Sequence, residues 1–297
     1  MKIDELVINS IYIIENLRQD DLLTGKELKQ HIESIESSVS VGYFPTSDKN
    51  ELFSRLELVI EQSSPNEGVI LFFETHGSRE GIDLAGELVS WEEINEYLSR
   101  LNDKTCMGLV VVFSCCFGVN FYKQTTLLKK CPYYLMLGFD NKITERKLIE
   151  CNKKIIDFAT LGCSPKQIEE EVNLLLPMTN TKMTVLDAGD VFYSGFKKYL
   201  ISSSDEDDLN RRAINNYREH FYTCIGTAYS FLEFKEKMYR KILSRTYLEE
   251  YFYRIKDRFL LTDKYLDLNC RFSGMFDELY DECDIESKHL DILKKLT

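Results

Sequence analysis

The sequence predicts an α/β fold, with a mostly parallel sheet flanked by helices on both faces and a C-terminal helical subdomain. Up to about residue 200, short apolar segments of strand length alternate with segments that have helical spacing or a helix-capping pattern. This repetition of strand, helix and strand favours right-handed crossovers and parallel pairing. Beyond residue 200 the strand patterns stop, and apolar residues recur every four positions, as in helices.

Several segments before residue 190 are expected to form strands. Most are runs of β-branched and other apolar residues, which are typical of strands buried on both faces of a parallel sheet. The second segment alternates polar and apolar residues, and the last is the weakest candidate. In chain order the segments are 7–14, 38–44, 68–77, 109–118, 133–139 and 183–186.

Helices are expected between these strands. Four of them begin with Thr, Asp or Ser followed three residues later by Glu or Gln, a pattern that gives side-chain partners to two free backbone N–H groups. The fourth also has Pro at its first helical position. The pairs are Thr24 with Glu27, Asp48 with Glu51, Ser90 with Glu93 and Ser164 with Gln167, and further helices are expected up to Lys130 and from Ile143 to about Ala159.

A change of composition near residue 200 predicts two domains. Residues 202–208 form a polar, acidic run with the composition of a linker. This linker would separate a first domain, residues 1–201, from a helical region, residues 209–297. Basic and acidic residues alternate in the helical region, as on a solvated surface. We expect residues 209–297 to regulate or recruit rather than to catalyse, and to bind a regulatory protein partner.

Charge and cysteine content narrow the classes of function. The net charge of −12 argues against nucleic acid or an anionic membrane as the main partner. The chain starts without a signal-peptide pattern and has no apolar run of membrane-span length, so we expect a cytoplasmic protein. Nine cysteines without a CxxC pair indicate reduced thiols and no structural zinc site. No glycine-rich phosphate loop occurs, and we expect no metal or cofactor.

Two of the predicted strands end in chemically useful residues. The strand at 68–77 ends in His76 and Gly77, and the strand at 109–118 carries Cys116 two residues before Gly118. The carboxyl ends of parallel strands lie at the sheet edge where ligands bind, so the His and the Cys could meet there. A thiol nucleophile needs a nearby imidazole to take its proton. We therefore predict a catalytic dyad of His76 and Cys116.

The same strand ends offer donors for an oxyanion hole. Acyl transfer develops a negative oxygen that backbone N–H groups can stabilise. Gly77 lacks a Cβ and so permits close approach of the backbone to a substrate, and the amide of Cys116 is a second natural donor. Gly118 would ease the turn that follows the nucleophile. The backbone at Gly77 and Cys116 is therefore our predicted oxyanion hole.

These residues resemble the caspase-like peptidases, the clan that includes caspases, metacaspases, legumain, gingipain, separase and the prokaryotic CHAT proteases. Its members carry a hydrophobic strand ending in His-Gly and a later one ending in a small residue, Cys, any residue and often Gly. Here Thr75-His76-Gly77 matches the first block, and the second is matched by Cys115-Cys116-Phe117-Gly118.

The resemblance, which is nearest to the prokaryotic caspase-like and CHAT proteases, covers roughly residues 5 to 200. It implies a caspase-like peptidase domain with Cys116 as nucleophile and His76 as base. Cys115 stands where the family usually has Ala, so the sequence presents two neighbouring thiols. In this family, strand ends beside the nucleophile form the substrate pocket. Glu15 and Asp140 follow strands at such places and would favour Arg or Lys before the cut, unless they are ordinary loop acids.

The sequence is consistent with three different functions. The first is an intracellular cysteine endopeptidase that acts on a protein or peptide and is switched on by a partner or signal. The second is a catalytically inactive caspase-like module used for binding. The third is a flavodoxin-like or other doubly wound domain that binds a nucleotide or a response signal. The absence of a glycine-rich phosphate loop and of an acidic phosphoacceptor cluster after the first strand disfavours it. A Cys at a strand end is most often ordinary core, and only the joint occurrence of Cys116, His76 and both glycines favours catalysis.

Overall fold

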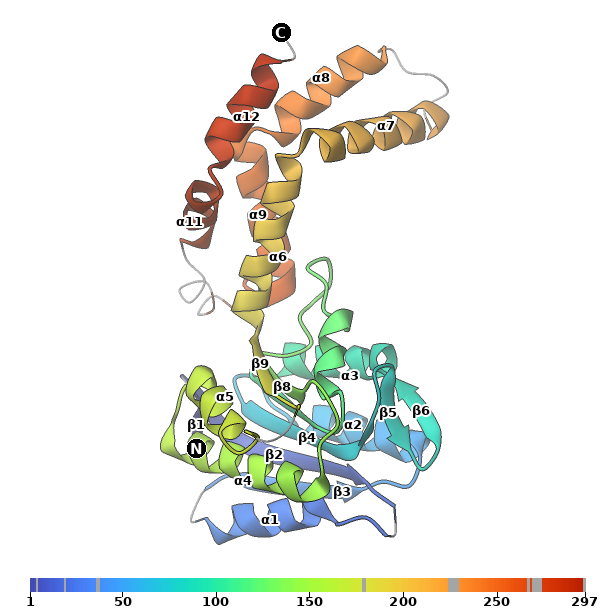
Figure 1. Cartoon of the computed structure of the whole chain (residues 1–297), viewed down its shortest axis with the longest axis vertical. Helices are drawn as coiled ribbons and strands as arrows, with labels where there is room; N and C mark the ends of the chain where they lie inside the picture. The colour runs from blue at the N-terminus through green and yellow to red at the C-terminus, as the bar shows by residue number, and fades with distance from the viewer. Residues whose placement is uncertain are drawn as a thin grey trace. The chain divides into compact units, whose positions relative to one another are not determined.

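The computed structural model describes the chain except residues 4, 19, 36–37, 178–179, 224–229, 266–267, 269–273 and 296–297. It divides into two compact units, Met1–Ala188 and Gly189–Thr297 (Figure 1). The first unit contains the sheet, and the elements described in the second are helices.

The first unit is a mixed α/β structure built on a mostly parallel sheet. β2, β4, β7 and β8 lie side by side in parallel, β3 pairs in parallel with the outer side of β2, and the short β1 and the last strand β9 are antiparallel. A hairpin of β5 and β6 extends from the end of β4. The strands are β1 Lys2–Ile3, β2 Leu6–Asn16, β3 Ser40–Pro45, β4 Gly68–Gly77, β5 Gly81–Leu84, β6 Glu87–Ser90, β7 Leu109–Ser114, β8 Leu135–Phe139 and β9 Met183–Asp187.

Helices cover both faces of this sheet, which explains why its central strands are apolar over most of their length. Even-numbered residues of β4 and β7, such as Ile70 and Val110, pack in one core with α1, α4 and α5. On the other face Phe113 meets Trp91 of α3, with ring centroids 5.1 Å apart. The helices are α1 Thr24–Ser34, α4 Glu145–Leu161 and α5 Pro165–Asn173 on the first face, and α2 Lys49–Gln62 and α3 Trp91–Lys104 on the second.

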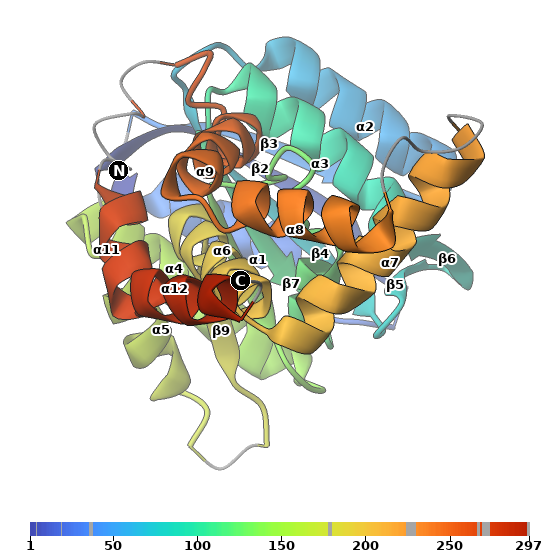
Figure 2. The ribbon, with the colours of Figure 1, turned by 90° about the horizontal axis from the view of Figure 1, so that it is seen from above.

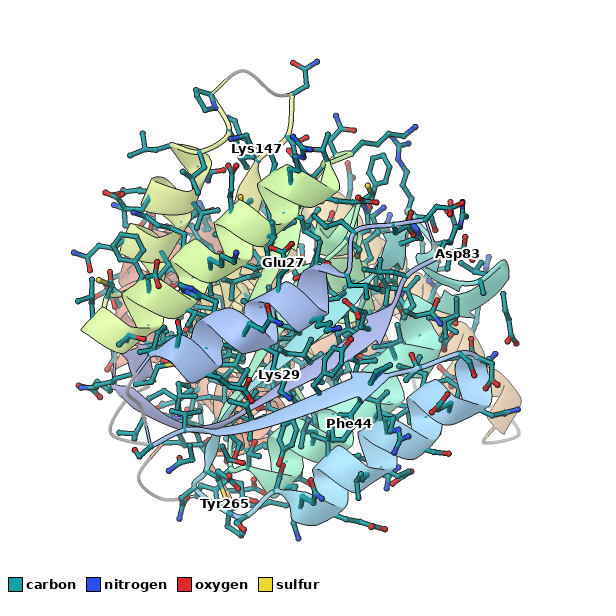
Figure 3. The ribbon with its side chains drawn as sticks, turned by 90° about the horizontal axis from the view of Figure 1, so that it is seen from below. Glu27, Lys29, Phe44, Asp83, Lys147 and Tyr265 are labelled. Carbon is teal, nitrogen blue, oxygen red and sulfur yellow. The ribbon has the colours of Figure 1, made fainter. Side chains whose placement is uncertain are left out.

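The helices on each face also contact one another. Figure 2 shows α2 and α3 running side by side, and the rings of Phe53 and Tyr97 stack between them at 4.7 Å. In Figure 3, Glu27 lies where α1 faces α4, and its carboxylate pairs with Lys153 of α4 at 3.3 Å. Neighbouring helices on each face of the sheet are therefore packed against one another.

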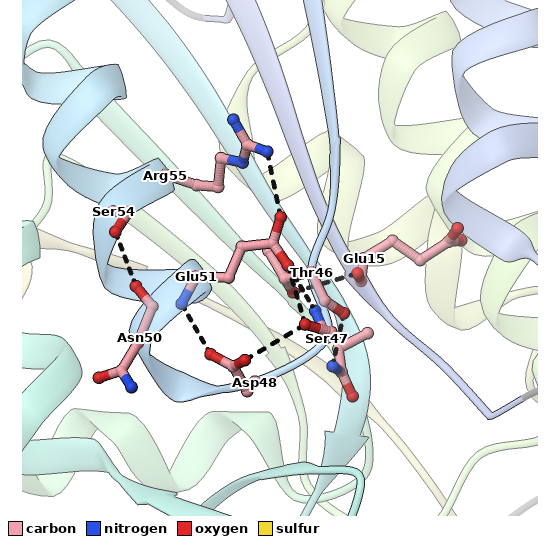
Figure 4. Close-up of polar contacts among 9 residues, drawn as sticks. Glu15, Thr46, Ser47, Asp48, Asn50, Glu51, Ser54 and Arg55 are labelled. Carbon is pink, nitrogen blue, oxygen red and sulfur yellow. Dashed lines mark hydrogen bonds and ion pairs between the residues drawn. The ribbon is translucent and has the colours of Figure 1, made fainter.

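Two of the four predicted capping patterns are confirmed in full. The pattern at Asp48 is confirmed in half, because the Glu51 carboxylate accepts the Ser47 amide and not that of Asp48. Asp48 accepts the backbone N–H of Glu51 at 2.9 Å at the start of α2 (Figure 4), and α3 and α5 both begin with a complete capping box. The prediction for Thr24 is wrong. The helix starts at Thr24 itself after an uncapped Leu23, and the Thr24 hydroxyl donates to the buried Glu74 instead. The hydroxyl therefore binds the buried carboxyl of Glu74 and does not cap the helix.

Two other expectations need correction. Instead of a helix up to Lys130, β7 is followed by a short 3-10 helix, η1 (Gly118–Gln124). The β-branched pair Thr125 and Thr126 comes next, and Pro132 lies just beyond, so the sequence supports no longer helix there. The weak strand candidate at 183–186 does form, but β9 runs antiparallel to β8 at the edge of the sheet.

The second unit has two clusters of packed side chains. Four aromatic residues of α6 and α9, namely Phe192, Phe196, Phe252 and Phe259, form the first, and the second joins α7, α8 and α12. None of the helices in the described part of the chain is long and apolar enough to cross a membrane. The helices are α6 Ala188–Ser203, α7 Glu206–Thr223, α8 Phe231–Ile242, α9 Arg245–Leu260, α11 Met275–Glu282 and α12 Ile285–Lys294.

The boundary between the units differs from the predicted one. It lies between Ala188 and Gly189, so α6 belongs with the helical region and not with residues 1–201. Residues 202–208 are not an extended linker, because α6 continues to Ser203, which is fully buried, and α7 begins at Glu206. Asp205 precedes α7 and accepts the Asp208 amide, and the other three acids of this run occupy the first turn of α7, where the helix dipole stabilises negative charge.

Candidate active site

The two predicted strand ends lie side by side. Glu74 of β4 pairs in register with Ser114 of β7, so the residues that follow both strands reach the same edge of the sheet. A Cβ on Gly77 would lie 2.2 Å from the carbonyl oxygen of Cys116 and 2.7 Å from Sγ of Cys115. Only a residue without a side chain lets the His strand and the Cys turn approach this closely.

A cavity of about 500 Å³ opens at this edge, and both His76 and Cys116 line it. The structure thus brings together the two residues that the sequence predicts as a dyad. Hydroxyl groups, apolar side chains and one residue of each charge complete the lining. The other lining residues are Leu17, Thr24, Thr75, Ser114, Cys115, Ile143, Thr144, Glu145, Arg146 and Leu148.

The two neighbouring thiols have different environments. Cys115 is 2% exposed, and burial raises the pKa of its thiol well above the ordinary value. Cys116 is partly exposed, and its Sγ lies 3.8 Å from the carbonyl oxygen of Ile143, a weak thiol hydrogen bond. Because the reactive form of a Cys is the thiolate, a buried thiol that resists ionisation is a poor nucleophile. Cys116 is the accessible sulfur of the pair.

A tight turn follows Cys116. Phe117 has a left-handed backbone with φ of 59°, which costs a non-glycine residue on the order of 1 kcal/mol. A Cβ on Gly118 would lie 2.6 Å from Cβ of Phe113, so the turn also requires this glycine. The guanidinium of Arg79, from the β4–β5 turn, sits 5.5 Å over the Phe117 ring. The turn that carries the thiol is therefore packed against the segment that follows the imidazole.

His76 has a carboxylate partner that the sequence did not predict. Its Nε2 lies 2.7 Å from Oδ2 of Asp21, in the segment between β2 and α1, and the Arg18 backbone N–H donates to the same oxygen at 2.6 Å. Burial acts to raise the pKa of Asp21, but these two hydrogen bonds and the charge of His76 outweigh it and lower the pKa. Asp20 and Asp21 are adjacent loop acids in the sequence, and no spacing singles out either of them.

Glu74 is a buried carboxyl behind the cavity wall. It accepts hydrogen bonds from the Thr24 hydroxyl and from Nδ2 of Asn152, both at 2.7 Å. Ser114 lies beside the same carboxyl without a hydrogen bond of good geometry to it. Burial raises the pKa of Glu74 to about 8, against the effect of its hydrogen bonds. Since Thr24 and Ser114 line the cavity, Glu74 supports its wall from behind.

The structure brings neither predicted pocket acid to the cavity. The carboxylate of Glu15 is buried, where it accepts hydrogen bonds from the Gly25 amide and the Tyr43 hydroxyl. In Figure 4 its side chain extends away from the polar residues at the start of α2. Asp140 accepts the Lys182 amide at 2.7 Å, at the start of β9. The acid that does line the cavity is Glu145, which accepts the backbone N–H of Leu22.

Within the ranges that the structure describes, no three His, Cys, Asp or Glu residues are grouped so as to hold a metal ion. Compared with known proteins, the chain matches no family model and no curated sequence.

Proposed function

We propose that the chain is a cysteine endopeptidase of the caspase-like type, with Cys116 as nucleophile and His76 as its base. One observation carries this proposal: an accessible thiol and an imidazole bound to a carboxylate line the same cavity, at the carboxyl ends of neighbouring parallel strands. Sheet edges of this kind are where ligands bind in α/β proteins, and a thiol beside an imidazole is the arrangement of a covalent catalyst.

The reaction follows from these groups. Sγ of Cys116 loses its proton to His76 and attacks the carbonyl carbon of the scissile peptide. The negative oxygen of the tetrahedral intermediate accepts hydrogen bonds from the backbone N–H groups of Cys116 and Gly77. His76 then gives its proton to the leaving amine, and water hydrolyses the thioester that remains. No metal or organic cofactor takes part in these reaction steps.

Substrate and setting follow from the same proposal. We expect a protein or peptide substrate, a regulatory protein partner for the helical second unit, and a cytoplasmic location, where thiols remain reduced. The predicted preference for Arg or Lys before the cut depended on Glu15 and Asp140. Neither acid lines the cavity, so this preference is not part of the proposal. Sequencing of the cleavage products identifies the preferred substrate residue.

Replacement of Cys116 tests the proposal. Cys116→Ala should abolish peptide cleavage and labelling by a peptidyl acyloxymethyl ketone, because the nucleophile is gone. The matched control is Cys115→Ala, which removes the neighbouring buried thiol and should retain activity. His76→Ala should lower labelling of Cys116 by about 100-fold or more, the usual contribution of a positioned base.

Mass spectrometry of the labelled peptide identifies the reacting sulfur. Labelling that persists in Cys116→Ala and disappears in Cys115→Ala would reverse the assignment of the two thiols. A folded wild-type chain that takes up no electrophile at Cys116 would instead support the inactive binding module.

A further inference from the structure

We propose that Asp21 is a positioning residue of the site, which orients the His76 ring and fixes which of its nitrogens acts as the base. This inference rests on the proposed peptidase function and deepens it. The contact that carries it joins Oδ2 of Asp21 and Nε2 of His76 at 2.7 Å. A plain dyad of thiol and imidazole gives no role to this carboxylate.

The contact determines the tautomer of the imidazole. An ionised carboxylate can only accept hydrogen bonds, so the nitrogen facing Asp21 must carry a hydrogen. A neutral imidazole has one N–H, which leaves Nδ1 as the free basic nitrogen. When Nδ1 takes the thiol proton, the imidazolium that forms already lies against a negative charge. Asp21 therefore favours both the correct tautomer and the charged state that the reaction requires.

Asp21 is itself held in place. The backbone N–H of Arg18 donates to the same carboxylate oxygen at 2.6 Å. On one side of Asp21 the Arg18 guanidinium pairs with Asp83 of β5 at 3.5 Å, and on the other the Leu22 amide bonds Glu145 of α4 at 3.2 Å. The segment is thus tied to the hairpin that follows His76 and to the helix that lines the cavity.

The exposure of the two side chains indicates whether Asp21 orients the His76 ring or mainly stabilises the fold. The side chain of Asp21 is 16% exposed and that of His76 is 35% exposed. Even when His76 is protonated, a pair in which one partner is this exposed contributes little to folding, typically below about 1 kcal/mol. A carboxylate that is fixed by backbone and side-chain contacts and faces a cavity-lining imidazole has a more direct use in positioning that ring.

The test uses the full chain and a reaction that needs no known substrate, the alkylation of Cys116 by iodoacetamide across a range of pH. Asp21→Asn should slow alkylation near pH 7 by about tenfold or more and move the profile to higher pH. An Asn amide can donate to Nε2 and so favour the wrong tautomer, which should make Asp21→Asn at least as slow as Asp21→Ala. Asp21→Glu should recover part of the rate.

The matched control is Asp20→Asn, which removes an equal charge from the exposed neighbour and should leave the profile unchanged. If Asp21→Asn behaves like Asp20→Asn while His76→Ala still slows alkylation, the role of Asp21 is refuted and the dyad stands. If His76→Ala itself has no effect, the proposed peptidase fails. Should Asp21→Asn lower the melting temperature, nitrogen NMR of the wild-type imidazole decides, since a hydrogen on Nδ1 overturns the inference.

Discussion

Glu74 illustrates how burial changes the chemistry of a single residue at this site. Its carboxyl is fully buried, with the Thr24 hydroxyl and the Asn152 amide as donors. Burial disfavours the charged form, and neighbouring Glu15 adds to this effect, so the pKa rises to about 8. At neutral pH the folded protein keeps a proton here that an unfolded chain would release.

We predict that replacing Glu74 by Gln flattens the pH dependence of stability. Between the ordinary pKa of 4.5 and the folded value of about 8, the folded state binds more protons than the unfolded state. Stability from this group is therefore complete below pH 4.5 and falls as pH rises, by up to about 1.4 kcal/mol per pH unit. Urea unfolding at several pH values measures the slope.

Glu33→Gln is the control for this change, since Glu33 is an exposed acid of α1 whose side chain is 53% accessible. It should leave the slope as in the wild type. An unchanged slope in Glu74→Gln would show that Glu74 is ionised in the folded protein at neutral pH.

At the scale of elements, the site depends on how closely the end of β4 meets the turn after β7. Gly77 lacks the Cβ that would separate the two segments. Gly118 lets the turn fold back against Phe113 of β7, and left-handed Phe117 turns the chain directly after Cys116. Both strands are apolar over most of their length, so their register is set by the core and not by the site. The polar groups are consequently confined to the last residues of each strand.

We predict that Gly77→Ala damages the site more than it damages the fold. The added methyl would meet the backbone oxygen of Cys116 at 2.2 Å, so the backbone itself must move. Stability should fall by about 1–3 kcal/mol, the usual cost of overpacking, and alkylation of Cys116 should lose its dependence on His76.

Gly86→Ala provides the comparison, because Gly86 lies in the β5–β6 turn with φ of 99° and has open space around it. Its cost should be backbone strain alone, with alkylation unchanged. Normal His-dependent alkylation in Gly77→Ala would mean that the close approach of the two segments is not needed.

At the scale of the whole molecule, the cavity belongs to one unit. Every residue that lines it lies between Leu17 and Leu148, inside Met1–Ala188. That unit also has its own core, in which strands β2, β4, β7 and β8 pack against α1, α4 and α5. The second unit has its own clusters, one of Phe side chains from α6 and α9 and one that joins α7, α8 and α12.

We predict that a fragment of residues 1–188 folds and keeps the difference between the two thiols. Cys116 should react with iodoacetamide in a His76-dependent manner, and Cys115 should react only after unfolding, because its environment is built within this unit. Circular dichroism and mass spectrometry of the alkylated fragment provide the measurement. A fragment that is unfolded, or in which both thiols react alike, would contradict this prediction.

The sequence by itself determined the α/β class, most of the strands and the placement of His76 and Cys116 at one edge of the sheet. Apolar runs of strand length and capping pairs are local signals, so β2, β4, β7 and β8 and the starts of α2, α3 and α5 follow from neighbouring residues. Parallel pairing then brings the carboxyl ends of successive strands to one edge, whatever the distance between them in sequence.

Only the tertiary structure decided what surrounds that pair. Asp21, Glu74 and Glu15 are all acids near strand ends in the sequence, yet the first faces His76, the second is buried behind the cavity and the third is buried beside Tyr43. Their roles depend on which helix and loop cover them, and no local pattern encodes that. The boundary at Ala188 could not be predicted either, because an acidic run has the same composition in a linker and in the first turn of a helix.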